Sequence, residues 1–266
     1  MRTALVTGAS SGIGAACATR LAASGWRVFA GVRNEGDAPA AAEELLLDVT
    51  DPAQIAAAAE GIHDLDALVN NAGIAIAMPL EFIPLEELRR QLEVNVIGQV
   101  AVTQAFLPHL RRSRGRVVFV GSVAGQSALP FLGAYAASKH ALEAIADTLR
   151  VELKPFGVHV SIVEPGTIRT PIWTKSAQVA DSLVDGAPAE LAALYGQRIA
   201  AFRRVAAARG AGGGSVEAVS GAVEQALTRE RPRTRKLVGR DAKIRSGIER
   251  LPDRVRDTLY ERLLLR

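Results

Sequence analysis

Hydrophobic residues along the chain fall into short continuous runs, separated by longer stretches in which they recur every three or four residues. A short apolar run predicts a buried strand, and the wider spacing predicts a helix that buries one face. The pattern predicts seven strands, at residues 3–6, 27–32, 45–47, 66–70, 116–120, 158–163 and 236–238. Helices are expected at residues 15–24, 38–44, 52–61, 85–110 and 134–153, with a helical tail after the last strand. This alternation is typical of an α/β fold with one parallel sheet covered on both faces.

Composition indicates a single domain with a large core. The chain has 266 residues, of which 48% are hydrophobic, and one open sheet can absorb this length. The single cysteine, Cys17, falls within the first helix, so no disulfide can form within the chain. We therefore expect a cytoplasmic location, with Cys17 as a small core residue. No apolar run reaches the roughly 18 residues of a membrane span, and the first strand begins at residue 3, which leaves no room for a signal peptide.

Tyr135 and Lys139 are the most informative polar pair. They lie four residues apart in a predicted helix, so their side chains are expected on one face. A nearby positive charge stabilises a phenolate and lowers the pKa of the phenol, which would let the pair act as a general acid and base. An isolated pair at this spacing is usually part of a solvated helix face. Ser122, which lies 13 residues before Tyr135, and a glycine-rich turn upstream set this pair apart.

The glycine-rich turn follows the first strand and has the sequence TGASSGIG at residues 7–14. Gly8 permits a sharp turn, while Gly12 and Gly14 let the backbone and the following helix approach a pyrophosphate closely. The N-terminus of that helix adds free N–H groups and the positive end of the helix dipole. A flexible loop is the ordinary alternative, which the flanking strand and helix disfavour.

Six motifs occur in a fixed order along the first two thirds of the chain. They are TGxxxGIG at residues 7–14, NNAG at 70–73, Asn95, Ser122, YxxxK at 135–139 and PG at 165–166. In this combination the chain resembles the short-chain dehydrogenase/reductase family. The resemblance implies a single doubly wound Rossmann-type domain with a mostly seven-stranded parallel sheet and a helical substrate lid. Residues 28–33 and 237–243 resemble more narrowly the branch that acts on steroids, retinoids and related lipophilic alcohols.

The resemblance implies an oxidoreductase that transfers hydride between a nicotinamide and a carbonyl or secondary alcohol. Its catalytic residues would be Asn95, Ser122, Tyr135 and Lys139. Tyr135 would exchange a proton with the substrate oxygen, and Ser122 would hydrogen-bond the same oxygen. Lys139 would lower the pKa of Tyr135 and bind the nicotinamide ribose, while Asn95 would hold a water that links Lys139 to solvent. As alternatives, Ser122 could be a turn residue and Asn95 a satisfied core amide.

By the same resemblance, the cofactor would bind across the carboxyl ends of the strands. Asp48 and Val49 would contact the adenine, residues 71–73 would pass beside the adenine ribose, and Pro165 and Gly166 would line the nicotinamide. The full set of expected cofactor-binding residues is Gly8, Ser10, Ser11, Gly12, Ile13, Gly14, Arg33, Asp48, Val49, Asn71, Ala72, Gly73, Tyr135, Lys139, Pro165, Gly166, Ile168 and Thr170.

The end of the second predicted strand bears on the choice between NADP and NAD. An enzyme that selects NAD places a carboxylate there, about 20 residues beyond the glycines, to bind the ribose 2′-hydroxyl. This chain has Arg33 instead, and a guanidinium suits a 2′-phosphate. Two observations favour NAD instead. NADP enzymes often carry a second basic residue where this chain has Ser11, and two acidic residues, Glu35 and Asp37, lie near Arg33. NADP(H) is therefore favoured, with NAD(H) as the alternative.

The expected partner is a small-molecule alcohol or ketone. The four histidines lack metal-ligand spacing, so no metal site is predicted. Residues 229–245 contain eight Lys or Arg but no aromatic residue, which favours a solvated surface over nucleic-acid binding or stable membrane insertion. The helices at 85–110 and 134–153 carry apolar residues on more than one face. The resemblance implies that these helices form the interface of a homotetramer or homodimer.

Residues 1–266 are expected to form one domain with three parts. Residues 1–165 would bind the cofactor and carry the catalytic residues, 166–210 would form a substrate-binding lid, and 211–266 would add a strand and a helical tail. Segments as long as 166–210 rarely lack a role in compact domains, and the apolar side chains here suit a lipophilic substrate. Two rival functions use the same fold: a non-catalytic NADP(H)-binding sensor or scaffold, and an epimerase or dehydratase. The complete Tyr–Lys pair disfavours the first.

Overall fold

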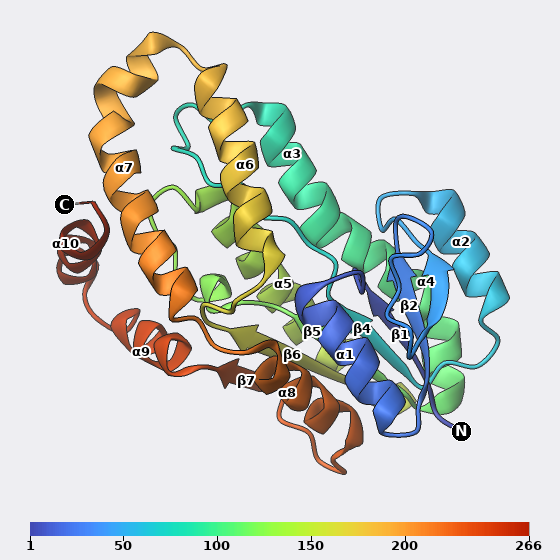
Figure 1. Ribbon diagram of the computed structural model, residues 1–266. Coiled ribbons are helices and arrows are strands. Elements are labelled where there is room, and N and C mark those ends of the chain that lie inside the picture. The colour runs from blue at the N-terminus through green and yellow to red at the C-terminus, as the bar shows by residue number, and fades with distance from the viewer. Residues whose placement is uncertain (266) are drawn as a thin grey trace.

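The computed structural model describes residues 1–265, except for the side chains of Arg209 and Ala211. As the sequence predicts, seven strands form one parallel sheet; their order is β3-β2-β1-β4-β5-β6-β7 (Figure 1). The strands are β1 (Thr3–Thr7), β2 (Arg27–Val32), β3 (Glu43–Leu46), β4 (Ala67–Asn70), β5 (Arg116–Val120), β6 (His159–Pro165) and β7 (Arg235–Val238). The strand order reverses between β1 and β4, and ligands of open α/β sheets bind at such a switch point.

Helices cover both faces of the sheet because successive strand residues point to opposite sides. On one face Ala4 and Val6 of β1 pack against α1 (Gly12–Ala23) and α8 (Val216–Thr228). On the other face Leu5 belongs to the core under α2 (Pro52–Gly61), α4 (Gly98–Ser113) and α5 (Gly133–Glu152). The sheet is therefore buried on both sides.

Two helix predictions differ from the structure. Residues 38–44 are not helical: a turn closes from the amide of Ala42 to the carbonyl of Pro39, and β3 then pairs with β2. The alanines favour a helix locally, but the stretch is short, and the ladder to β2 together with the ion pair between Arg27 and Glu43 favours an edge strand. The predicted helix at 85–110 is interrupted, and consists of α3 (Leu85–Leu92), a π-helical turn at Glu93–Ile97 and α4.

Beyond the carboxyl ends of β5 and β6, a group of helices extends away from the sheet (Figure 1). The helices α6 (Pro171–Asp185) and α7 (Ala189–Ala211) form an antiparallel pair, and α9 (Arg240–Ile248) and α10 (Asp253–Leu264) lie beside α7. The α10 residues Tyr260 and Leu264 share a small apolar core with Leu129, Trp173 and Phe202. Among the helices that the structure describes, none is long and apolar enough to cross a membrane.

Candidate active site

The glycine-rich turn connects β1 to α1 in a backbone conformation that favours glycine. Gly8 and Gly12 have φ values of +63° and +57°, in the left-handed region. A Cβ atom at Gly14 would lie 2.2 Å from the carbonyl oxygen of Gly8, so the helix packs directly on the turn. The first turn of α1 carries no side-chain cap, since the Ser11 hydroxyl does not bond to it. The turn therefore leaves backbone N–H groups and the Ser11 hydroxyl for an anionic ligand.

Four hydrogen bonds, which the sequence alone does not predict, hold this turn against the end of β4. The Thr7 hydroxyl accepts bonds from the backbone amides of Asn71 and Ala72, at 3.0 and 3.1 Å. The Asn71 side-chain amide donates to the carbonyls of Thr7 and Gly8, each at 3.0 Å. Asn71 thus fixes the glycine turn through its side chain, in addition to lining the cavity beside it.

Ser122 follows β5 and begins a single 3₁₀ turn, in which its hydroxyl accepts a bond from the amide of Ala124 at 3.1 Å. Ser122 and Tyr135 are both buried and line the same cavity. The structure therefore brings together two residues that lie on separate predicted elements.

Tyr135 and Lys139 share one face of α5, as their spacing predicts. The Lys139 ammonium lies 5.8 Å from the centroid of the Tyr135 ring and donates a bond of 2.9 Å to the carbonyl of Val120. Burial raises the pKa of Tyr135, while the hydrogen bond from Ser122 and the charge of Arg245 act in the opposite direction. Burial lowers the pKa of Lys139 to about 8, against the effect of Glu143. Arg245 is therefore a further cation that acts on the phenol, one that the sequence did not indicate.

Asn95 lies at the centre of the π-helical turn and is fully buried. Its side chain donates bonds of 3.0 Å to the carbonyl of Ile74 and to the hydroxyl of Ser138, and accepts one of 2.8 Å from the amide of Ile74. Such π turns in helices are frequent at functional sites. Here the turn lets Asn95 hold the loop after β4 against the catalytic helix.

The opposite end of the site lies beyond β2 and β3. Arg33 is exposed there, whereas the neighbouring Asp37 carboxylate accepts a bond of 3.0 Å from Asn34. Asp48 follows β3, and its carboxylate accepts bonds of 2.9 and 2.7 Å from the amide and hydroxyl of Thr50. Arg33 and Asp48 both face the same cavity.

The turn after β6 completes the site. The amide of Thr167 donates a bond of 2.6 Å to the carboxylate of Asp241, and a Cβ atom at Gly166 would lie 2.2 Å from that carboxylate. Gly166 is therefore required by the approach of Asp241 from α9. Thr170, the N-cap of α6, lies across from Gly12, whose added Cβ would be 3.3 Å from the Thr170 methyl group.

One cavity of about 950 Å³ joins all these parts. Every site residue predicted from the sequence lines it except Gly14 and Asn95, which lie behind its wall. The predicted residues on the wall are Gly8, Ser10, Ser11, Gly12, Ile13, Arg33, Asp48, Val49, Asn71, Ala72, Gly73, Ser122, Tyr135, Lys139, Pro165, Gly166, Ile168 and Thr170. The cavity therefore runs continuously from Arg33 to Tyr135.

Comparison with known proteins agrees with this geometry. The family model for short chain dehydrogenases matches residues 2–180. The chain belongs to the short-chain dehydrogenase family. It is 37% identical to an NADPH-dependent 3-dehydrocapnine reductase from Ornithobacterium rhinotracheale, across 98% of this chain and 96% of that protein. It is 38% identical to 17-beta-hydroxysteroid dehydrogenase type 6 from Homo sapiens, across 90% and 80%. A short chain dehydrogenase from Burkholderia cenocepacia, crystallised in complex with NADP, superposes with a TM-score of 0.75 at 30% identity, covering 99% of each chain.

Two residues of this short-chain dehydrogenase contribute to the site from outside the motifs. Trp173 of α6 lies edge-on to Tyr135, with ring centroids 6.0 Å apart, and lines the cavity. Arg245 of α9 donates bonds of 3.1 and 2.6 Å to the Ser127 hydroxyl. Trp173 falls within the lid segment predicted at residues 166–210, whereas no local pattern signals Arg245, since α9 reaches the site only through the tertiary fold.

Cys17 is a core residue, as predicted. It is 1% exposed on α1, and burial raises the pKa of its thiol to about 12. A thiol held in its protonated form is a poor nucleophile. Within the part of the chain that the structure describes, the His, Cys, Asp and Glu side chains form no group of three or more that could hold a metal ion.

Proposed function

We propose that this short-chain dehydrogenase is an NADP(H)-preferring oxidoreductase that acts on a carbonyl or secondary alcohol of a lipophilic substrate. The observation that carries the proposal is the continuity of the cavity. Ser122, Tyr135 and Lys139 line one end of it, and the glycine turn and Arg33 line the other. A dinucleotide bound along the strand ends would have its two halves at these two places.

The catalytic residues are suited to moving a proton. When bound, the nicotinamide supplies or accepts the hydride. During reduction the Tyr135 hydroxyl would donate its proton to the substrate oxygen, which the Ser122 hydroxyl would hold. Because burial raises the pKa of Tyr135, the phenol stays protonated at neutral pH and is ready to donate. The Lys139 ammonium, 5.8 Å from the ring centroid, would stabilise the phenolate that remains.

The site also fits the cofactor chemically. The left-handed Gly8 and Gly12, and the close contact at Gly14, leave room and N–H donors for a pyrophosphate. At the far end, the exposed Arg33 is available to a 2′-phosphate. The relative from Ornithobacterium rhinotracheale is named as NADPH-dependent, which supports the same preference.

The helices α6 and α7 support a lipophilic substrate. Ile172 and Trp173 pack with Ala75 and Ala124 around Tyr135, so the wall beside the catalytic hydroxyl is largely apolar. Residues 166–210 would act as the lid, and α7 extends one residue further, to Ala211. Closure of such a segment excludes water from the reacting groups. We expect proteolysis to cut first within residues 166–210, and NADPH with substrate to protect them.

A homodimer or homotetramer is part of the proposal. A groove of about 410 Å³ lies along the outer faces of α4 and α5, lined by Val100, Leu107, Ile145 and Leu149 among others. A second copy with closed symmetry would cover this apolar surface. Sedimentation equilibrium should give a mass of two or four chains of 28.1 kDa each. A stable monomer at micromolar concentration would contradict this part.

The experiment that tests the proposed function is a substrate panel. Oxidation of NADPH is followed by its absorbance with ketones of increasing apolar bulk, and with small sugars as controls. The proposal expects turnover that increases with apolar bulk. Cofactor binding without turnover of any ketone or alcohol would instead favour the non-catalytic sensor.

A further inference from the structure

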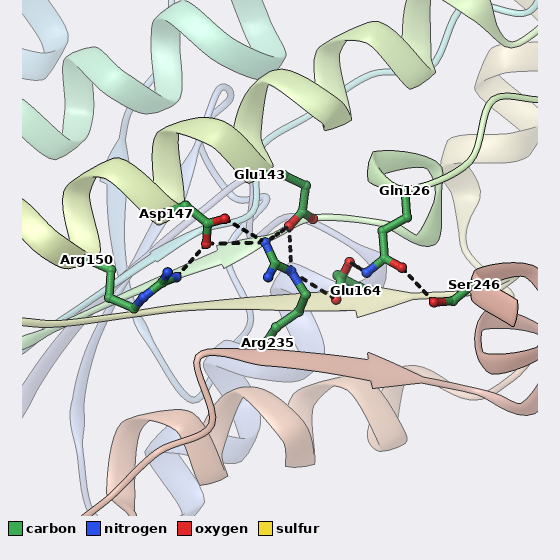
Figure 2. Close-up of polar contacts among 7 residues, drawn as sticks. All are labelled: Gln126, Glu143, Asp147, Arg150, Glu164, Arg235 and Ser246. Carbon is green, nitrogen blue, oxygen red and sulfur yellow. Dashed lines mark hydrogen bonds and ion pairs between the residues drawn. The ribbon is translucent and has the colours of Figure 1, made fainter. Parts of the chain in front are cut away.

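Two buried carboxyl groups, those of Glu143 and Glu164, both lie against the Arg235 guanidinium (Figure 2). Glu143 lies one helical turn after Lys139 on α5, and Glu164 is the penultimate residue of β6, next to Pro165. Glu164 is fully buried and Glu143 is 9% exposed. Neither lines the cavity, so the proposed reaction gives them no chemical role.

The two acids have an incomplete set of donors (Figure 2). Arg235 of β7 donates bonds of 2.9 and 2.7 Å to Glu143 Oε2, and lies 3.8 Å from Glu164 Oε2. The side-chain amide of Gln126 donates to Glu164 Oε1. Glu143 Oε1 and Glu164 Oε2 have no hydrogen-bond partner among the described residues, although both are buried. Unsatisfied buried carboxylate oxygens are costly, so a donor is missing from this cluster.

The surrounding charges do not balance two ionised carboxylates. Arg235 is shared with Asp147 of α5, whose carboxylate lies 3.2 Å from the guanidinium and also pairs with Arg150. Lys139, the other nearby cation, directs its ammonium to the carbonyl of Val120. Burial raises the pKa of Glu164 to about 8, and the charge of Glu143 acts in the same direction. Gln126 and Arg235 oppose this shift.

We propose that Glu143 and Glu164 share one proton, and that this proton-bridged pair is a positioning unit that joins the catalytic turn to the cofactor turn. The shared proton supplies the missing hydrogen-bond donor between the two carboxyls. The pair keeps one negative charge, with which Glu143 interacts with Arg235 and Lys139. The positioning role rests on the proposed function, whereas the sharing of a proton does not.

The contacts show what the pair would position. A Cβ atom at Gly125 would lie 2.9 Å from Glu143 Oε1, so the turn that begins at Ser122 packs directly on this carboxyl. Gln126 links Glu164 to α9, because its side-chain oxygen accepts a bond of 2.7 Å from Ser246. Glu164 also precedes the turn that lines the nicotinamide end of the cavity. Loss of the shared proton would place two charges at the point where these segments meet.

Unfolding in urea tests the shared proton without any substrate. A carboxyl whose pKa is raised by folding stabilises the fold most below its ordinary pKa of 4.5, and this contribution is lost as the pH rises to about 8. Glu164→Gln cannot titrate, yet its amide can donate to Glu143 as the acid would. The stability of Glu164→Gln relative to the native protein should therefore increase from pH 4.5 to about 8 and then stay constant.

The matched control is Glu249→Gln, which alters a carboxylate on the C-terminal helices that binds Arg256 and Tyr260. The free energy of unfolding of Glu249→Gln should change with pH in parallel with that of the native protein. Parallel curves for the native protein and Glu164→Gln would overturn the shared proton. Infrared spectra of the native protein should also show the C=O band of a protonated carboxylic acid at neutral pH, which Glu143→Gln and Glu164→Gln remove. Absence of that band would overturn the proposal even if Glu164→Gln did not fold.

Turnover tests the positioning role. Glu164→Gln should keep kcat within about twofold at neutral pH, while Glu164→Ala, which leaves Gln126 without its acceptor, should lower kcat about tenfold or more. Equal kcat values for folded Ala and Gln variants would overturn the positioning role. If no substrate is turned over at all, the proposed function fails, and the stability and infrared results still decide whether the proton is shared.

Discussion

Replacement of Arg33 by alanine tests how the protein distinguishes its cofactors. Arg33 is exposed at the cavity wall, and the carboxylate of Asp37 in the same loop is bonded to Asn34. The Arg33 guanidinium is therefore available to a 2′-phosphate. A hydrogen bond to a charged group contributes about 1.5–3 kcal/mol, and exposure to solvent places this one in the lower part of that range.

We expect Arg33→Ala to weaken NADPH binding by about 1.5–2 kcal/mol, or about 10–30-fold in Kd. The Kd of NADH should change less than about twofold, because NADH lacks the phosphate. The stability of the fold should change by no more than about 0.5 kcal/mol, since an exposed side chain is removed.

Fluorescence titration of both cofactors gives these dissociation constants directly. Arg231→Ala is the matched control, since Arg231 is also exposed but lies outside the cavity wall. It should alter neither Kd, which separates a local contact from a general loss of positive charge. If Arg33→Ala lost the same affinity for NADPH and for NADH, Arg33 would not be binding the 2′-phosphate.

Three further predictions concern the turn, the lysine and the lid. Gly14→Ala should lower stability by about 1–3 kcal/mol and weaken both cofactors, because its Cβ would lie 2.2 Å from the Gly8 carbonyl oxygen; Gly61→Ala, where a Cβ meets nothing within 4 Å, is the control in urea unfolding. The rate of ketone reduction should fall as the pH rises through about 8, because burial lowers the pKa of Lys139 to that value and the ammonium is then neutral. The rate is measured in the Glu164→Gln variant, so that Glu164 does not titrate in the same range. A rate that stays constant across this range would contradict a role for the charge of Lys139. Trp173→Ala should raise kcat/KM for the bulkiest ketones relative to small ones, and an unchanged ratio would show that Trp173 does not shape the pocket.

The parts of the site that depend on local sequence were predictable. The glycine turn, the YxxxK pair and the residues at strand ends lie at one edge of the sheet because parallel strands bring their carboxyl ends together. Helix periodicity also predicted α5. In the helix predicted at 85–110 it could not show the π turn at Asn95, because the hydrogen-bond partners of Asn95 come from other segments.

Contributions from distant segments were not predictable. Arg245 and Glu164 reach the site or its support through packing between elements far apart in the chain. Residues 38–44 show the same limit, because alanine content favoured a helix and pairing with β2 made Glu43–Leu46 a strand. Local preference was weaker there than the tertiary hydrogen bonds.

The most direct test of the central claim compares the native protein with Tyr135→Phe on a bulky apolar ketone. NADPH oxidation is measured by absorbance, and NADPH binding by fluorescence in the same samples. We predict that Tyr135→Phe lowers kcat by about 10²–10⁴-fold, because the proton donor is lost. The Kd of NADPH should stay within about twofold, because the ring and its contact with Trp173 remain. If Tyr135→Phe retained most of the native turnover, the Tyr135 hydroxyl would not be the proton donor.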